Sequence, residues 1–175
     1  MKRWIFGLVA FSASLICTVS FAQWTKEKGL RIAPGFELTE LYKVPAAQGS
    51  WVSLTCDPSG RLIASDQYGK LYRVTIDASG QASVVEPIEL NTGRAHGLLY
   101  AFDALYVMSH EGDGQPSGLY RVTDTDADDK FDRVELLRQI NGSGEHGPHA
   151  IILSPDKKSL FICAEQRLCQ CVLRM

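Results

Sequence analysis

Apolar and polar residues alternate along most of the chain in short runs, and this pattern predicts strands rather than long helices. The strand candidates are residues 51–56, 61–65, 69–76, 82–90, 97–101, 104–108, 118–122, 134–140, 150–153 and 159–163, with one further alternating run at 34–42. Turn-forming residues separate these runs, as in Pro58-Ser-Gly60 and Ser79-Gly80. Short strands spaced in this way are typical of an all-β sandwich, barrel or propeller.

An internal repeat favours the propeller. The segment Gly69-Lys-Leu-Tyr-Arg-Val74 returns as Gly118-Leu-Tyr-Arg-Val122. His96 and His149 each begin a segment of the form His, small, three large apolar or aromatic residues, small, any, Asp, and Trp51 begins a looser third copy. A period of about 40–50 residues with four strands in each unit is the signature of a propeller blade. We therefore expect about two and a half blades.

The repeat also sets the expected domain organisation. After Cys163 the turn signals and the Gly-x-Leu-Tyr pattern stop. We expect residues 1–22 to be a signal peptide, residues 23–164 a partial β-propeller, and residues 165–175 an irregular C-terminal tail. The tail is interpreted as the end of a truncated gene or as a shifted reading frame.

The N-terminus has the three parts of a secretory signal peptide. Lys2-Arg3 are a positive segment, residues 4–19 are apolar, and Ser20 and Ala22 are the small residues before a cleavage site at Gln23. The alternatives are an N-terminal membrane anchor and a lipoprotein attached through Cys17. The signal peptide predicts a periplasmic or secreted protein with no transmembrane segment after cleavage.

Composition adds only broad limits. The chain is 45% hydrophobic and 22% charged with a formal net charge of −2, which is ordinary for a globular protein and gives no attraction to nucleic acid or an anionic membrane. Cys56 and Cys163 lie within apolar strand candidates and are predicted to be buried thiols. Cys169-Gln-Cys171 is a weak metal or redox motif, and the sequence does not choose among the possible disulfide pairings.

The segment 124–135 has the carboxylate spacing of a calcium-binding loop. Positions 1, 3, 5, 9 and 12 of this window are acidic, and position 7 contributes a backbone carbonyl in such loops. The predicted ligands are Asp124, Asp126, Asp128, Lys130 through its carbonyl, Asp132 and Glu135. Asp129 replaces the usual glycine at position 6, and aspartate can adopt the left-handed conformation. The flanking segments are strands and not helices, and the alternative is a solvated acidic loop.

Histidines mark the second group of candidates. Residues at equivalent points of successive blades lie on one ring around the propeller axis, so His96 and His149 are expected to face the same central funnel, with His146 close to His149. An imidazole near pH 7 can accept a proton or bind a metal. The alternative is that each histidine caps the start of a strand by a hydrogen bond to a neighbouring turn.

The stretch His146-Gly-Pro-His-Ala-Ile-Ile-Leu-Ser-Pro-Asp156 resembles a segment of the quinoprotein glucose/sorbosone dehydrogenases. Together with Ala95-His-Gly-Leu-Leu-Tyr-Ala-Phe-Asp103, the acidic loop and Glu145-His-Gly-Pro-His149, it is similar to bacterial "membrane-bound dehydrogenase" or L-sorbosone dehydrogenase-like proteins. The resemblance covers nearly all of the chain after the signal peptide. It implies a six-bladed β-propeller of the TolB-like or quinoprotein glucose dehydrogenase-like type.

The same resemblance implies an activity. Members of the family bind pyrroloquinoline quinone (PQQ) and Ca²⁺ and oxidise a small sugar or alcohol, passing the electrons to an acceptor. It places His146 on the catalytic base that takes the proton of the substrate hydroxyl, whereas the internal repeat gives His149 that place. By the same resemblance His96 and His149 would contact the cofactor.

The sequence also departs from the family pattern. The later blades, which hold most of the family's PQQ and calcium contacts, are not part of this sequence, so we expect the chain to be inactive alone. Two other interpretations are kept. One is a non-enzymatic, calcium-binding secreted propeller module that binds a partner or glycan, and the other is a propeller lactonase that uses calcium and a histidine.

Overall fold

The computed structural model describes residues 25–27, 29–142, 147–164 and 167–172. The chain divides into two compact units, residues 1–39 and residues 40–175. In the first unit β1 (Thr25–Glu27) pairs antiparallel with β2 (Leu30–Ile32). The strand predicted at 34–42 is wrong, because this segment runs as coil and Phe36 is 74% exposed. Apolar alternation makes a strand only where a second strand pairs with the backbone.

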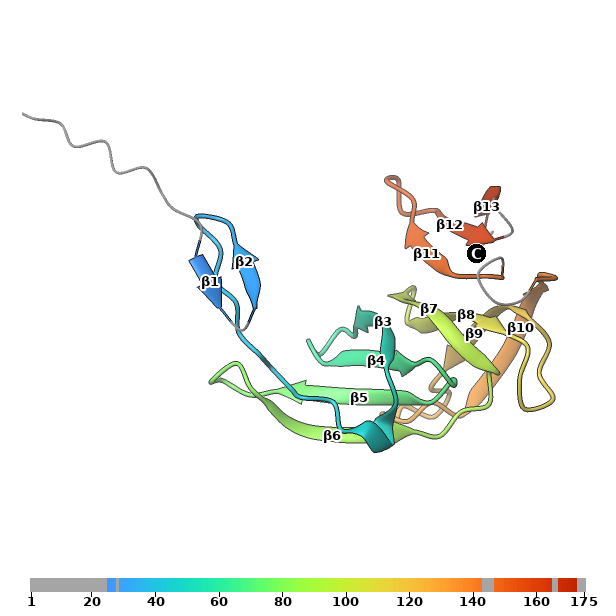
Figure 1. The fold of residues 1–175 in the computed structure, drawn as a ribbon. Coiled ribbons are helices and arrows are strands. Elements are labelled where there is room, and N and C mark those ends of the chain that lie inside the picture. Colours follow the sequence, from blue (N-terminus) through green and yellow to red (C-terminus); the bar gives the residue numbers. More distant parts are fainter. Residues whose placement is uncertain (1–24, 28, 143–146, 165–166, 173–175) are drawn as a thin grey trace, which may run out of the picture. The chain divides into compact units, whose positions relative to one another are not determined.

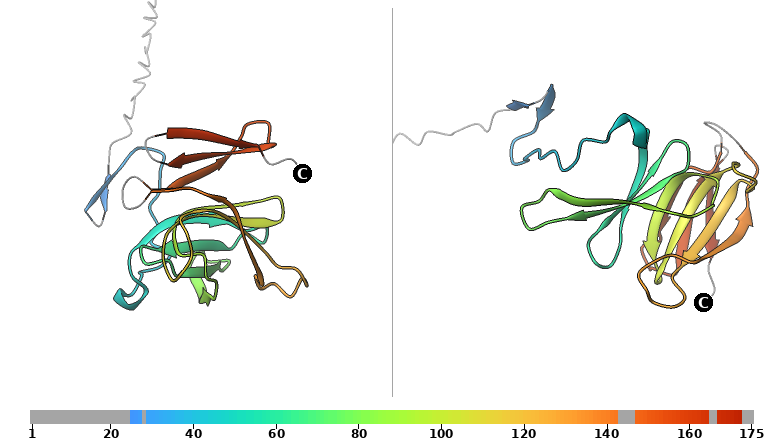
Figure 2. Two further views of the ribbon diagram at one scale, coloured as in Figure 1. Left: turned by 90° about the vertical axis from the view of Figure 1, so that its right-hand side faces the viewer. Right: turned by 90° about the horizontal axis from the view of Figure 1, so that it is seen from below.

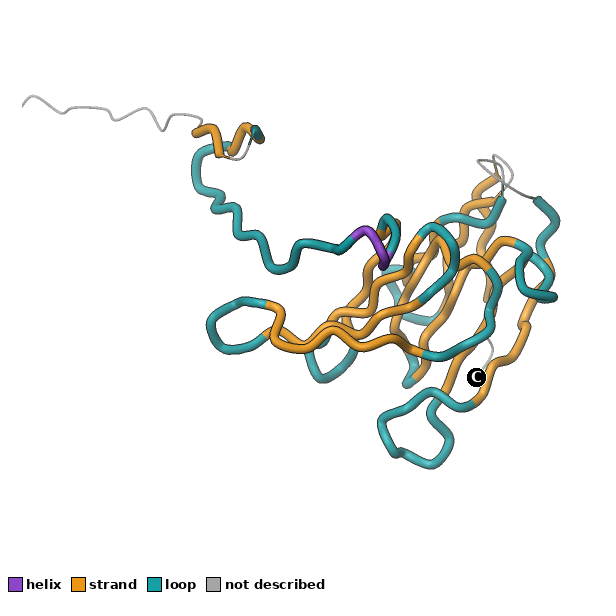
Figure 3. Tube along the Cα trace, turned by 60° about the horizontal axis from the view of Figure 1, so that its bottom comes forward, coloured by secondary structure: helices purple, strands orange, loops and turns teal. Residues whose placement is uncertain are grey.

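The second unit consists of three antiparallel sheets (Figures 1 and 3). Within each sheet, strands that follow one another in the chain are hydrogen-bonded neighbours. The first sheet contains β3 (Trp51–Cys56), β4 (Leu62–Asp66), β5 (Leu71–Ile76) and β6 (Ala82–Ile88). The second contains β7 (Arg94–Ala101), β8 (Ala104–His110), β9 (Gly118–Thr123) and β10 (Arg133–Gln139). The third contains β11 (Ala150–Leu153), β12 (Ser159–Ala164) and β13 (Arg167–Val172).

The prediction of an all-β fold is confirmed, and none of the three sheets closes on itself. In the described residues the single helix is the three-residue 3₁₀ turn η1 (Ala46–Gln48). No helix in that part of the chain is long and apolar enough to span a membrane. The segment 165–175, expected to be irregular, contains β13, which pairs antiparallel with β12 along its length. Without β13, β12 would be an edge strand with unpaired backbone groups, and β13 satisfies them.

The hairpin turns of the first sheet follow one scheme. Asp57, Asp66 and Asp77 each accept hydrogen bonds from backbone N–H groups two and four residues later, at 2.8–3.2 Å. A glycine with positive φ ends each turn, for example Gly60 at +78°. Aspartate followed by such a glycine specifies tight turns because the carboxylate replaces backbone partners and glycine tolerates the left-handed region. These turns fix which strands become neighbours.

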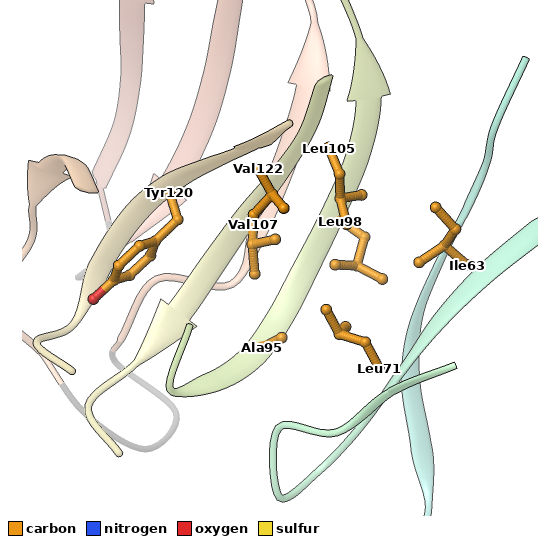
Figure 4. Close-up of a cluster of buried hydrophobic side chains, with 8 residues drawn as sticks. All are labelled: Ile63, Leu71, Ala95, Leu98, Leu105, Val107, Tyr120 and Val122. Atoms are coloured by element: carbon orange, nitrogen blue, oxygen red, sulfur yellow. The ribbon is translucent and has the colours of Figure 1, made fainter. Parts of the chain in front are cut away.

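The core lies on both faces of the second sheet. Strand β7 packs against β3 and β4 on one side and against β11 on the other (Figure 2). All seven residues of β8 are therefore buried, although successive side chains point to opposite faces. One cluster joins the first and second sheets (Figure 4) and consists of Ile63, Leu71, Ala95, Leu98, Leu105, Val107, Tyr120 and Val122. The other joins the second and third sheets and consists of Ala104, Tyr106, Met108, Leu119, Ile151, Leu160 and Ile162.

The prediction that two cysteines are buried is wrong, because both lie on sheet faces that no other sheet of the described residues covers. Cys56 and Cys163, predicted to be buried, are exposed free thiols. Cys56 shares its face of β3 with Val52 and Leu54, which are 45% and 57% exposed. The alternate residues of β3 face β7, since Ser53 Oγ accepts a hydrogen bond from the Leu98 N–H. The apolar content of a strand does not reveal which of its two faces another sheet covers.

Candidate functional site

Three histidines come together where the second and third sheets meet. His96 lies near the start of β7, His110 ends β8, and His149 directly precedes β11. The rings of His96 and His110 are stacked, with centroids 4.1 Å apart and planes inclined by 12°. The His149 ring stands edge-on to both, at 5.9 Å from His96 and 5.1 Å from His110. One ligand nitrogen from each histidine lies within 4.8 Å of the others.

Local backbone features bring the first two histidines together. The pairing of β7 with β8 shifts register between Ala95 and Gly97, so His96 is the extra residue of a β-bulge. Bulges redirect a side chain at the edge of a sheet. His110 pairs with Arg94 in the same register, which places it beside His96 on the neighbouring strand.

Two glycines let the third histidine approach. A Cβ on Gly97 would lie 2.1 Å from the backbone oxygen of His149, and a Cβ on Gly147 would lie 2.5 Å from His110 Nε2. Any side chain at these two positions would therefore separate the segment before β11 from β7 and β8. The His149 N–H also donates to the Cys163 carbonyl at 3.0 Å, which continues the β11–β12 ladder to this residue.

His110 is the most strongly constrained of the three. It is 6% exposed, and its imidazole has a hydrogen bond to the backbone of Pro148. Proline has no N–H, so the imidazole is the donor and the Pro148 carbonyl accepts. Nε2 is buried without a hydrogen-bond partner in the described structure, which identifies Nδ1 as the donating atom. This arrangement selects the tautomer that carries its lone pair on Nε2.

The electrostatics favour the neutral forms of His96 and His110. Burial, together with the smaller effects of the neighbouring His96, His149 and Arg94, lowers the pKa of His110 to about 4 against the opposing effect of the Pro148 hydrogen bond. Burial also lowers the pKa of His96, with smaller contributions from His149 and Arg94. Neutral imidazoles with available lone pairs can accept a proton from a bound hydroxyl group or bind a metal ion.

The sequence identified two of these three residues. His96 and His149 were predicted to face one site and the structure brings them together, whereas His146 lies outside the described residues. His110 was missed because the repeat does not mark the end of the second strand of each unit. If residues 97–101 and 104–108 had been treated as an antiparallel hairpin, pairing residues outward from the turn after Ala101 would have placed His110 beside His96. Trp51, the counterpart of His96, instead stacks between Tyr42 and Tyr72 with ring centroids 5.5 and 5.4 Å away.

The acidic loop between β9 and β10 forms a second cluster. Carboxylate oxygens of Asp124, Asp126 and Asp128 lie within 4.8 Å of one another. Asp124 Oδ1 accepts from the Ala127 N–H and Oδ2 from the Asp129 N–H, both at 2.8 Å. Asp129, at position 6, has φ +70°, so it adopts the left-handed conformation that glycine usually takes there. The first half of the loop is thus wound so that three carboxylates converge.

The other predicted calcium ligands have partners of their own. Asp132 accepts from the Thr125 N–H at 3.0 Å and from the Thr125 hydroxyl at 2.5 Å, and the latter bond lowers the pKa of Asp132. Glu135 lies on β10, where Arg121 and Arg133 pair with it at 2.5 and 2.6 Å and lower its pKa. The side chain of Lys130 lies 3.4 Å from Asp128. The role of these three residues as calcium ligands stays a prediction.

Comparison with known proteins adds no identification, since no family model matches this sequence and no curated protein matches it.

Proposed function

We propose that this chain forms blades of a β-propeller of the quinoprotein dehydrogenase type. Each of the first two sheets is a four-stranded antiparallel meander, and each packs face to face with the next, as propeller blades do. The outward face of β3 carries exposed Val52 and Leu54, and β11 carries Ile152, which is 60% exposed. These apolar positions are suited to contact with further blades. The six-bladed type is proposed from the family resemblance, and a periplasmic or secreted location is proposed from the signal-peptide pattern.

The proposed activity is the oxidation of a small sugar or alcohol with transfer of electrons to an acceptor. The observation that supports it is the meeting of His96 and His149, from equivalent points of successive sheets, around the buried His110. A neutral histidine beside a bound hydroxyl group would take its proton, and general-base catalysis contributes about 10²–10⁴-fold. The resemblance gives this role to His146, and the repeat gives it to His149.

The residues present are compatible with an anionic quinone such as PQQ. Arg94 pairs in register with His110, and its charge lowers the pKa of both His96 and His110. A guanidinium beside neutral imidazoles offers donors to a carboxylate and to a quinone oxygen. Bound there, the quinone would supply the hydride acceptor. His96 and His149 would contact it, and calcium would complete the cofactor set.

The test measures quinone binding and turnover separately. Calorimetry with PQQ and millimolar Ca²⁺ is expected to show binding that His149→Ala weakens at least tenfold. The control Lys158→Ala, on an exposed turn, is expected to bind as the wild type does. Absence of PQQ binding to the wild-type chain would overturn the proposal. Dye reduction with aldoses and alcohols is assayed in parallel and is expected to be absent for this chain alone, and hydrolysis of lactones without PQQ would favour the lactonase instead.

A second function is favoured by the convergence of Asp124, Asp126 and Asp128. In this proposal the chain is a calcium-binding, non-enzymatic module that binds a partner or glycan through its loops. Carboxylate oxygens are the ligands that Ca²⁺ prefers, and a loop that already gathers three of them loses less entropy on binding. Calcium binding without quinone binding or turnover would support this function over the first.

A further inference from the structure

We propose that His96, His110 and His149 bind a divalent transition-metal ion of the zinc class, with water as a fourth ligand. The proposal goes beyond the proposed function and does not depend on it, because neither quinone binding nor propeller closure enters the argument. It concerns a site other than the acidic loop, whose ligands are all oxygen atoms. It also gives a role to His110, which the proposed dehydrogenase chemistry does not require.

The distances are close to those of a metal site. Zinc binds imidazole nitrogen at about 2.0–2.1 Å, which puts two nitrogens of a tetrahedral site about 3.3 Å apart. The three nitrogens here lie within 4.8 Å of one another. The side chains must rotate to close this difference when the metal binds. The stacked rings of His96 and His110 must tilt, because the lone pairs of parallel rings do not converge on one point.

The surroundings of His110 orient it as a ligand. The Pro148 carbonyl accepts a hydrogen bond from Nδ1, and the opposite nitrogen, Nε2, is buried without a hydrogen-bond partner in the described structure. Metal-binding histidines usually donate their second ring N–H to such a carbonyl, which fixes both tautomer and ring orientation. A buried acceptor without a partner is destabilising. A metal ion on Nε2 would remove that destabilisation.

The ligand set decides which metals fit. Imidazole suits zinc, copper, nickel and iron, whereas Ca²⁺ and Mg²⁺ prefer oxygen ligands. Three histidines leave one tetrahedral position for water, the arrangement of catalytic rather than structural zinc sites. The lone pairs of all three histidines would be used by the metal. His149 could not then act as a base in the metal-bound protein, and the base role would remain with His146.

The test uses the full chain after treatment with EDTA and titration with Zn²⁺ and Co²⁺. We expect one equivalent to bind, with the intense visible absorption of four-coordinate Co²⁺. His96→Ala, His110→Ala and His149→Ala should each weaken Zn²⁺ binding at least tenfold in competition with a chelator. The matched control is Asp124→Ala/Asp126→Ala, which removes the other cluster and should leave Zn²⁺ affinity within twofold.

A rescue variant guards against loss of folding in the alanine variants. His149→Cys replaces one nitrogen ligand by a thiolate, so we expect Co²⁺ binding to persist with a new sulfur-to-cobalt charge-transfer band. Absence of binding to the wild-type chain would overturn the proposal. Binding that the aspartate variant abolishes, or only the weak absorption of six-coordinate Co²⁺, would overturn it too, because either result means an adventitious ion at another place.

Discussion

Asp129 accepts two hydrogen bonds from the guanidinium of Arg61, a residue 68 positions earlier in the chain, at 2.5 and 2.6 Å. Asp129 is position 6 of the acidic loop of the second sheet, and Arg61 leads into β4 of the first. Arg73 of the first sheet donates to the Asp129 backbone oxygen at 2.8 Å and lies over the Phe131 ring. The conformation of the acidic loop is therefore linked to the contact between the first two sheets.

We predict that the Arg61–Asp129 pair couples these sheets measurably. Asp129→Asn removes the charge but keeps the backbone oxygen that Arg73 contacts. A double-mutant cycle with Arg61→Gln should give a coupling energy of about 0.5–1 kcal/mol, the upper part of the range for exposed ion pairs, because the pair is bidentate. Urea unfolding at low salt measures it. A coupling energy near zero, or one unchanged in 1 M NaCl, would contradict this account.

Calcium should stabilise the chain through the acidic loop. We predict weak binding, with a dissociation constant of about 10⁻⁴–10⁻³ M as in extracellular calcium modules. Thermal melting of the whole chain with and without millimolar Ca²⁺ is the appropriate measurement, because an excised loop would lose the sheet that holds it. We expect a rise in Tm that is absent in Asp124→Ala/Asp126→Ala.

Glu111→Gln is the control for this prediction, since it removes one exposed negative charge outside the loop. It should keep the full calcium response. An unchanged Tm at millimolar Ca²⁺ in the wild type would remove the calcium proposal, as would an equal shift in the double-aspartate variant.

The sequence predicted β3 to β12 of the second unit well because the signals for these strands were local. The turn residues of Asp57-Pro-Ser-Gly60 act within four positions, and the run of 51–56 coincides with β3. The error at 34–42 arose because alternation does not reveal whether a partner strand exists. The strand β13 was missed because a partner strand exists that the local sequence does not reveal. It forms by pairing with β12, and no pattern inside 165–175 encodes that partner.

Only part of the candidate site was predicted, because the sequence pattern marks some of its residues and not others. The repeat in the sequence compares equivalent points of successive units, so it found His96 and His149. His110 joins them through the antiparallel register of one hairpin, and a bulge at His96 adjusts that register. The contacts of Gly97 and Gly147 are between sheets and have no sequence signature beyond the glycines themselves.

Buried tyrosines should make the protein sensitive to alkali. Tyr120 is 1% exposed, burial raises its pKa, and its hydroxyl donates to the Pro116 carbonyl. Above about pH 10 the unfolded chain loses the tyrosine proton while the folded chain keeps it. The stabilisation is thus complete below pH 10 and is lost as pH rises toward the folded-state pKa, with a slope of at most about 1.4 kcal/mol per pH unit.

Tyr120→Phe tests this account by urea unfolding from pH 8 to pH 11. At pH 8 the variant should be about 1 kcal/mol less stable, because the hydrogen bond is lost. Its stability should then fall less steeply with pH than that of the wild type, so that the two curves converge. Parallel curves would show that Tyr120 does not contribute to the alkaline transition.

The last prediction concerns the close approach of the third sheet to the second. A Cβ at Gly97 would lie 2.1 Å from the His149 oxygen and 3.1 Å from Met108 Cβ, and Gly97 does not have positive φ. Gly97→Ala should therefore destabilise the chain for steric reasons alone, by about 2–3 kcal/mol. Gly80→Ala is the matched control, because nothing lies within 4 Å and only its φ of +78° opposes a side chain. We expect it to cost about 1 kcal/mol.

Amide hydrogen exchange separates the steric effect from a general loss of stability. If the His149 carbonyl must move away, β11 should exchange faster in Gly97→Ala, whereas Ile63 and Leu71 in the first sheet should change only as global unfolding requires. In Gly80→Ala the third sheet should exchange as in the wild type once global stability is matched by urea. A Gly97→Ala protein as stable as the Gly80→Ala control, with unchanged exchange in β11, would show that the two sheets do not meet at this glycine.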